Sequence, residues 1–254
     1  GGDLGRISPE IPGQQSRPVT GILAEASAES TRLLVLAVGS AVVLGVAIGA
    51  FAAVRRHSVL ALPTLTLTVV GVSVPSFLLA LLLQVGSIVF YKRTGVRLVL
   101  FGPNLRGAKS LLPKIVLPAA VLAARPLAHV TRVTFIALSD ALEQDYVRTA
   151  RAKGLREILV FWHHVLRNAG VRILTAAALS LRFALGSLPI VEIFFDQAGL
   201  GVVMLSGIFG REEALVAGAA LGLGVTLLLI NMGLDLIYRV IDPTLRDPGN
   251  GGSA

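Results

Sequence analysis

The chain contains 254 residues, of which 54% are apolar and only 15% are charged, and it has no cysteine. Soluble domains carry about 25% charged residues, so this composition predicts a polytopic membrane protein whose surface largely faces lipid. The net charge of +8 comes from 23 Lys and Arg against 15 Asp and Glu. Basic loops and helix ends give membrane proteins such a balance, so nucleic-acid binding is not expected. Without cysteine, disulfides, thiolate catalysis and cysteine metal sites are excluded.

Five apolar runs are long enough to cross a membrane, because a helix needs about 20 apolar residues to span roughly 30 Å of hydrocarbon. The runs lie at about 32–54, 63–90, 111–137, 168–191 and 214–238. Residues 1–31 contain Gly, Pro, Ser and Glu without periodicity, which predicts a polar arm outside the membrane, and residues 247–254 form a carboxy-terminal tail. Basic residues are divided evenly between the loops on the two sides, so they do not orient the chain.

Small residues and one proline predict how the runs pack. Gly45 and Gly49 in the first run, and Gly218 and Gly222 in the fifth, have the four-residue spacing that permits close helix approach. Pro75 is expected to kink the second run, where neighbouring helices can satisfy the freed carbonyl.

Two arginines fall near the middle of predicted spans, Arg125 in the third and Arg182 in the fourth. No Asp or Glu occurs between Glu29 and Asp140, and an ionisable residue at this depth usually faces a cavity or a partner. We therefore expect a water-filled, electropositive path shared with a second subunit. Snorkelling, or pairing with a carboxylate of that subunit, is the alternative. Ser73 and Gln84 are expected to line the same path, although uncharged polar residues also join helices.

The polar stretch at 138–168 separates the third and fourth runs. Its apolar residues recur at helical spacing, which predicts short amphipathic helices at the membrane face, broken at Gly154. A generic interfacial loop, whose cations only hold lipid phosphates, is the alternative reading.

The stretch contains DYVRTARAKGL and, at 164–169, HVLRNA, and these segments resemble the cytoplasmic loop of permeases from the dipeptide/oligopeptide branch of ABC importers. In DYVRTARAKGL, Arg148, Thr149 and Ala150 fill the family triplet and Gly154 takes the glycine position. The segments VEIFFDQAGLG (191–201) and NMGLDLIYRVIDPTLR (231–246) are also similar to the family. Ala198 and Thr244 stand where the family usually has proline and arginine. The likeness covers residues 32–246.

The resemblance implies an all-α integral membrane protein with the type I importer permease fold, in the inner membrane of a bacterium. It implies a further spanning helix ahead of residue 1, the arm outside, and the 138–167 loop and carboxy end in the cytoplasm. The partners it implies are a second homologous permease, two ABC ATPase subunits and an extracytoplasmic substrate-binding protein. The residues expected to couple to an ATPase are Asp145, Tyr146, Arg148, Thr149, Ala150, Arg151, Ala152, Lys153 and Gly154.

No catalytic residue or cofactor is expected in the chain itself. It lacks the G-x-x-x-x-G-K-[ST] phosphate loop, so ATP and Mg would be bound by the ATPase subunits, and the four histidines do not form a metal site. A stand-alone secondary transporter or channel is the rival function. Such carriers place carboxylates near the midplane, and the runs contain none there. The solute stays open among peptides, glutathione, nickel complexes and haem.

Overall fold

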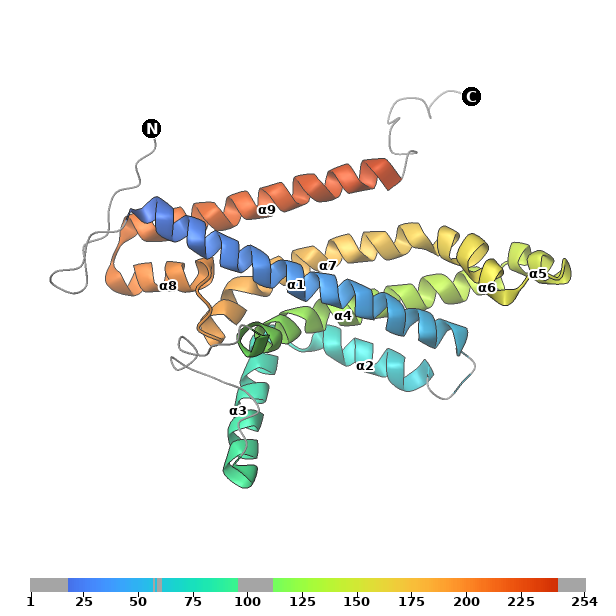
Figure 1. Ribbon diagram of the computed structural model, residues 1–254, viewed down its shortest axis with the longest axis horizontal. Coiled ribbons are helices and arrows are strands. Elements are labelled where there is room, and N and C mark those ends of the chain that lie inside the picture. The colour runs from blue at the N-terminus through green and yellow to red at the C-terminus, as the bar shows by residue number, and fades with distance from the viewer. Residues whose placement is uncertain (1–17, 57, 59–60, 96–111, 242–254) are drawn as a thin grey trace.

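The computed structural model describes residues 18–56, 58, 61–95 and 112–241, and the regular elements within them are helices. The start of the polar arm, the 247–254 tail and the end of the 231–246 segment, including Thr244, lie outside these residues. Four long helices run along the length of the molecule (Figure 1). They are α1 (Val19–Val54), α4 (Leu112–Glu143), α7 (Arg167–Phe194) and α9 (Glu213–Ile241).

Five helices in the described part of the chain are long and apolar enough to cross a membrane. Their bounds are Val19–Val54, Ser76–Thr94, Ile115–Glu143, Glu157–Phe194 and Glu213–Gly233. This confirms the predicted all-α membrane protein with five spans in this chain. The structure has two distinct ends, with α8 (Leu200–Gly210) at one and α5 (Asp145–Ala152) at the other (Figure 1). They are called the α8 end and the α5 end below.

The first helix begins at Val19, well before the expected Arg32, so the part of the arm at 19–31 is helical. The reason is composition: this segment contains Ala, Leu and Glu, which are good helix formers, although it is too polar to register as an apolar run. At about 1.5 Å per residue, its 36 residues exceed the thickness of the hydrocarbon core. The first turns of α1 can therefore extend beyond the membrane.

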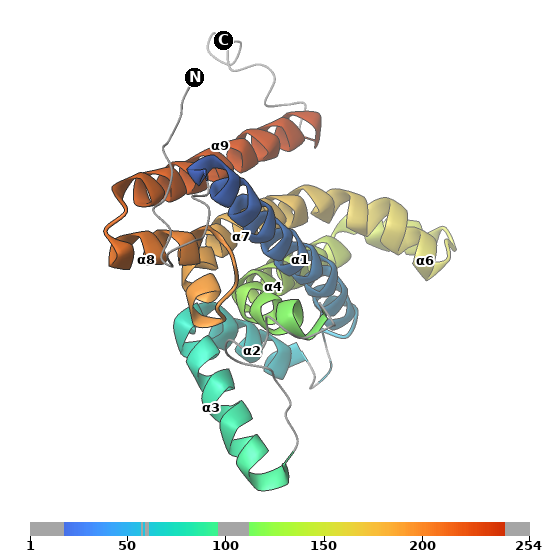
Figure 2. The same cartoon turned by 60° about the vertical axis from the view of Figure 1, so that its left-hand side comes forward.

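The expected second span, 63–90, is wrong as a single kinked helix. It forms two helices, α2 (Ala61–Ser73) and α3 (Ser76–Thr94), which point in different directions (Figures 1 and 2). Pro75 is the N-cap of α3 with extended backbone (φ −63°, ψ 139°). Because proline lacks an N–H and disfavours helical backbone before it, α2 ends here. Only α3 is then long enough to span.

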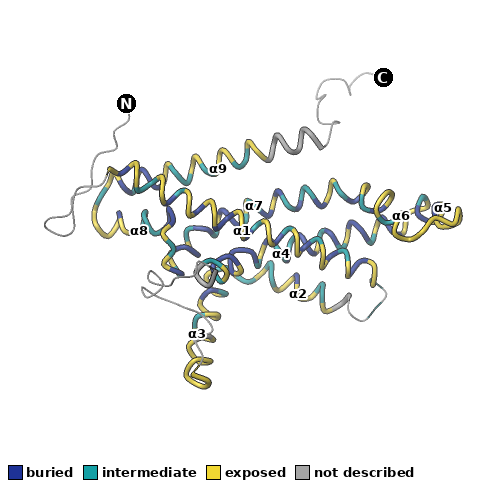
Figure 3. The backbone as a smooth tube through the Cα atoms, viewed as in Figure 1, coloured by how far each residue is buried: buried dark blue, intermediate teal, exposed yellow. Residues whose placement is uncertain are grey.

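The core lies where α1, α4 and α7 meet, and it includes the fully buried Leu34, Leu122 and Leu188 (Figure 3). The predicted close helix approach is confirmed at Gly45 and Gly49. A Cβ on Gly45 would lie 2.9 Å from Val130 Cβ, and one on Gly49 would lie 2.6 Å from the backbone oxygen of Thr131. The two glycines thus let α1 lie directly against α4.

Gly218 allows a similar close approach between helices at the α8 end. A Cβ on Gly218 of α9 would lie 2.6 Å from Leu23 of α1. Gly222 has ordinary clearance, 3.4 Å, from Leu200 of α8. The helix α8, which the sequence did not predict, is apolar but too short to span. It packs between the end of α7 and the start of α9 (Figure 2).

Candidate docking loop and translocation face

The α5 helix is amphipathic and lies at one end of the molecule, opposite α8 (Figure 1). Its Val147 and Ala150 are buried in a cluster, the α5-end cluster, that joins this loop to the long helices. The members of the cluster are Ala53, Ala137, Leu138, Ala141, Leu142, Val147, Ala150, Val160, Val165, Ala169 and Ile173. Ala150 therefore anchors α5 and is not available for the direct contact with an ATPase that the sequence led us to expect.

The other residues expected to couple to an ATPase lie at the surface. Asp145, Arg148, Thr149, Arg151, Ala152, Lys153 and Gly154 are exposed, and Tyr146 is half-buried. The hydroxyl of Tyr146 accepts a hydrogen bond from Asn168 Nδ2 of α7 at 2.9 Å. Tyr146 thus connects α5 to α7 as well as facing outward.

Gly154 ends α5 in a left-handed turn, with φ +74°. The Gly154 N–H donates to the Arg151 carbonyl at 2.9 Å, and the Leu155 N–H donates to the Ala150 carbonyl at 3.3 Å. These two bonds form a Schellman motif, in which glycine is favoured because other residues are strained at positive φ. Among the described residues, no atom beyond the two chain neighbours lies within 4 Å of a Cβ placed on Gly154, so the requirement for glycine is one of backbone conformation.

The cations of the loop differ in their contacts. Arg151 donates to both carboxylate oxygens of Glu157, at 2.9 and 3.1 Å, and so ties α5 to the short helix α6 (Glu157–Val160). Arg148 lies 3.5 Å from Asp145 on its own helix. The bidentate pair makes Arg151 a bracing residue within the loop, and it leaves Arg148 and Lys153 as the more outward charges.

An exposed apolar surface follows Gly154, and the sequence analysis missed it. We call it the α6 patch; it consists of Leu155, Ile158, Leu159 and Trp162. Trp162 is 59% exposed and lies in a π-helix, η2 (Phe161–Leu166), that leads into α7. The signal was the apolar run ILVFW at 158–162, inside a polar loop. A single turn of π-helix is frequent at functional sites, and exposed apolar patches mark interaction surfaces.

Two ion pairs fasten the α5 end to the long helices. Arg172 of α7 bonds Asp140 of α4 at 3.0 Å, and Arg56, after α1, lies 3.6 Å from Glu143. Together with the α5-end cluster, they connect the loop mechanically to α1, α4 and α7.

Arg125 and Arg182 lie on α4 and α7, two helices that pack against each other. The Arg125 guanidinium lies 4.8 Å from the centre of the Phe183 ring, and His129 meets the same ring edge-on at 5.4 Å. Arg182 Nε donates to Asn231 Oδ1 of α9 at 3.2 Å. Both arginines are exposed. They hold a cation–aromatic contact and a neutral hydrogen bond, so their charge is not neutralised by either contact.

A third cation, Arg132, is exposed on α4. It follows Arg125 by seven residues, which places both on one helix face. The sequence analysis passed over Arg132, although this spacing was the signal for it. We call Arg125, His129, Arg132 and Phe183, together with Arg182, which precedes Phe183 on α7 and bonds α9, the cation face.

Ser73 and Gln84, which are expected to line the path, each donate a hydrogen bond to helix backbone. Ser73, at the end of α2, donates to its own helix at the Val69 carbonyl, 2.8 Å away. Gln84 Nε2 of α3 donates to the Phe194 carbonyl at 3.2 Å. Phe194 ends α7 about 18 Å along the helix from Arg182. Both residues therefore contact helix backbone, and their place in the path stays a prediction.

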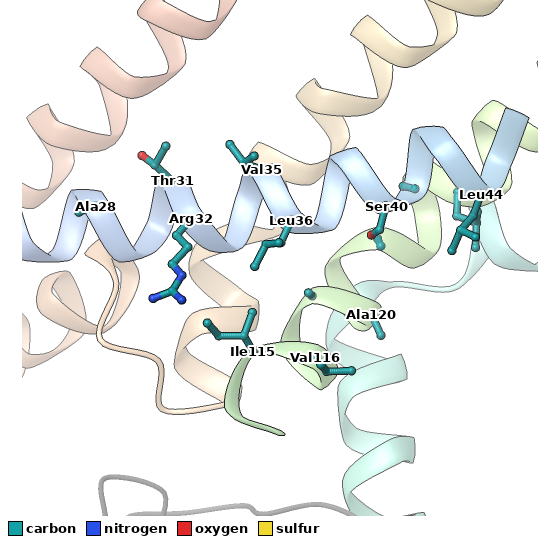
Figure 4. Close-up of a pocket in the computed structure, with 14 residues that line it drawn as sticks. Ala28, Thr31, Arg32, Val35, Leu36, Ser40, Leu44, Ile115, Val116 and Ala120 are labelled. Carbon is teal, nitrogen blue, oxygen red and sulfur yellow. The ribbon is translucent and has the colours of Figure 1, made fainter. Parts of the chain in front are cut away.

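An apolar groove of about 930 Å³ lies between α1 and α4. Figure 4 shows Val35, Leu36 and Leu44 along it, with Arg32 extending toward Ile115 near one end. Among the described residues of the lining, Arg32 is the charged one. The groove therefore suits apolar chains better than the charged ends of a peptide.

The chain matches known transport proteins over most of its length. A model of the family described as "binding-protein-dependent transport system inner membrane component" matches residues 45–247. A putative peptide permease protein of Brucella suis is 34% identical over 233 residues, which is 90% of this chain and 72% of that protein. The glutathione transport system permease protein GsiC of Pectobacterium atrosepticum is 36% identical, over 91% of this chain and 72% of that protein.

A third relative and a solved structure are also similar to this chain. The dipeptide transport system permease protein DppB of Bacillus subtilis is 32% identical, over 85% of this chain and 67% of that protein. A chain of the MetNI methionine ABC transporter, in an inward-facing conformation, superposes with a TM-score of 0.66 at 19% identity. It covers 90% of this chain and 100% of its own, and at that identity it shows the fold alone. The chain therefore belongs to the family of binding-protein-dependent transport system inner membrane components, and is a multi-pass ABC importer permease of the inner membrane.

Proposed function

We propose that the chain is the permease subunit of an ATP-driven importer for peptides or similar small solutes, and that it forms half of a translocation path with a second homologous permease. The family match supports the permease role. The names of relatives, which include peptide, dipeptide and glutathione permeases, support the solute class.

The α5–α6 loop is the proposed docking element for an ATPase subunit. The observation that carries this role is the short exposed helix α5, which ends in a Schellman turn at Gly154 beside the α6 patch. A groove on an ATPase could receive Trp162 and Ile158, and its acidic rim could receive Arg148 and Lys153. Because Val147 is buried in the α5-end cluster, force on the loop would pass directly into α4 and α7.

This role places the α5 end in the cytoplasm and the α8 end outside. A binding protein would deliver solute at the α8 end, and two ATPase subunits, which bind ATP and Mg, would close and move the α5–α6 loop. The long helices would then rock from outward-open to inward-open. This chain contributes no bond chemistry to the cycle.

The cation face is the proposed lining of the path. Arg125 and Arg132 of α4 and Arg182 of α7 are exposed, and no carboxylate is bonded to them among the described residues. In a low-dielectric setting such cations attract a passing carboxylate, which every unmodified peptide carries at its C-terminus. Apolar side chains of a peptide could pass the Phe183 ring.

Cross-linking to an ATPase subunit tests the docking role. The chain has no cysteine, so single cysteines can be placed at Thr149, Ala152 and Trp162, all of which are exposed. We expect each to cross-link to the ATPase in the assembled complex. A cysteine at the fully buried Val147 is the matched control and should not react. Absence of cross-links from all three exposed positions would show that another surface docks the ATPase.

A further inference from the structure

Glu192, near the end of α7, is fully buried although it carries a carboxylate. Ser30 Oγ of α1 donates to its Oε1 at 2.5 Å, and the Gly201 N–H of α8 donates to its Oε2 at 2.7 Å. The Leu200 N–H in turn donates to Ser30 Oγ at 2.9 Å. One carboxylate and one hydroxyl therefore join three helices, and both carboxylate oxygens are used.

The arrangement suits an ionised carboxylate. The first N–H groups of a helix have no partner within it, and here Leu200 and Gly201, the first two residues of α8, donate to Ser30 and Glu192. A negative charge at a helix N-terminus is also favoured by the helix dipole. Hydrogen bonds to a charged group are stronger than those between neutral groups, so the N-terminus of α8 is a favourable environment for the Glu192 carboxylate.

The two glycines around the carboxylate allow this approach. A Cβ on Gly199 would overlap the Glu192 carboxylate carbon. A Cβ on Gly201 would lie 2.6 Å from Pro189 Cα and 3.0 Å from Glu192 Oε2. The A-G-L-G sequence at 198–201 thus forms a turn that closes over Glu192, and no other residue type fits at either glycine without displacement.

The connection continues into the fifth span. A Cβ on Gly207, in the last turns of α8, would lie 2.9 Å from Val216 of α9, so α8 and α9 are in direct contact. The first part of α1, the end of α7, α8 and the start of α9 therefore meet at the α8 end.

We propose that Glu192 and Ser30 form a clasp that makes the α8 end of this subunit move as one unit during transport, with Glu192 as the positioning residue of α8. This inference rests on the proposed function, which places the α8 end outside. Opening the clasp would leave a buried carboxylate and two N–H groups without partners, which is strongly unfavourable. The outer side of the path would then open between the two permease subunits, and not between α1, α7 and α8 of one subunit.

The amount of solute transported per ATP distinguishes a role of Glu192 in positioning α8 from a role in folding of the subunit. In Glu192→Gln the amide offers one acceptor where the carboxylate offers two, so either Gly201 or Ser30 loses its acceptor. The reconstituted complex with its ATPase subunits should still assemble and hydrolyse ATP. We expect solute moved per ATP to fall roughly tenfold, the order given by one lost hydrogen bond to a charged group, and solute leak without ATP to rise.

Ser30→Ala tests the clasp with Glu192 retained, and should give the same defect. The double variant should be no worse than the more affected single variant, because the two residues act together.

Two controls are available in the same region. Ser27 donates only within its own helix, to the Leu23 carbonyl at 2.7 Å, so Ser27→Ala should behave as wild type. Glu213 is exposed in the first turn of α9, so Glu213→Gln should too.

Amide hydrogen exchange gives a second measurement on the wild-type complex. The N–H groups of Leu200 and Gly201 should exchange slowly both without nucleotide and with ATP bound, because the clasp stays closed. Three results would each overturn the clasp. The first is fast exchange in one state, and the second is transport per ATP in Glu192→Gln equal to that of Glu213→Gln. The third is loss of assembly in both Glu192→Gln and Ser30→Ala. Failure of the wild-type complex to transport with ATP would instead overturn the proposed function.

Discussion

Gly154→Ala is expected to weaken the link between the permease and its ATPase. Gly154 has φ +74° and an open space around its missing Cβ, so the substitution creates no clash. Its cost comes from left-handed backbone alone, about 1–2 kcal/mol for a non-glycine residue. That free energy lowers the population of the Schellman turn by roughly 5- to 30-fold. Gly154→Val should cost more, because a β-branched residue tolerates positive φ poorly.

The assay measures the amount of ATPase subunit that co-purifies with each variant and the solute transported per ATP. Gly95→Ala is the matched control, since Gly95 also has positive φ (+72°) and no atom near a Cβ, but it ends α3. It should carry a similar strain and leave ATPase association unchanged. Gly154→Asn should be milder than Gly154→Ala, because asparagine tolerates this backbone better. Normal association and transport in Gly154→Val, or an equal loss in Gly95→Ala, would refute the reasoning.

Three further predictions follow from the cation face, the α6 patch and the packing of α1. Met in place of Arg125 or Arg182 should slow uptake of an anionic solute more than that of a neutral one, by roughly fivefold for a contribution of about 1 kcal/mol; an equal loss for both solutes in liposome uptake would indicate a structural role. Trp162→Ala should reduce ATPase co-purification while thermal stability of the isolated permease stays the same, and unchanged co-purification would remove the α6 patch from the interface. Gly49→Ala should destabilise the subunit by about 1–3 kcal/mol through overpacking, measured by thermal unfolding in detergent, whereas Gly39→Ala, which has open space at its Cβ, should not.

The spans could be predicted from hydropathy because each is a long apolar run, but their ends could not. The segment at 19–31 is polar enough to look like an arm, yet its helix formers extend α1 to Val19. At Pro75 the sequence indicated a kink, and the missing N–H instead ends α2. The short helix α8 fell below the length that hydropathy detects.

More of the docking loop than of the path or the clasp could be predicted, because the residues that determine the loop's turn lie close together in the sequence. The left-handed turn at Gly154 follows from residues a few positions away. The partners of Glu192, by contrast, include Ser30, which lies 162 residues earlier in the chain. Arg125 meets Phe183 across two helices, and no pattern within either helix indicates that pairing. Ala150 was expected to couple to an ATPase because it fills the family triplet, whereas the structure buries it on the inner face of α5.

Uptake into proteoliposomes tests the central claim most directly. The permease is reconstituted with its second permease, its ATPase subunits and its binding protein, and uptake of a labelled dipeptide is measured with ATP, without ATP, and with a proton gradient alone. The account predicts uptake only with ATP and with both ATPase subunits present, and a loss of that uptake in Gly154→Val. Uptake driven by a proton gradient through this chain without ATPase subunits would contradict it and identify a secondary transporter.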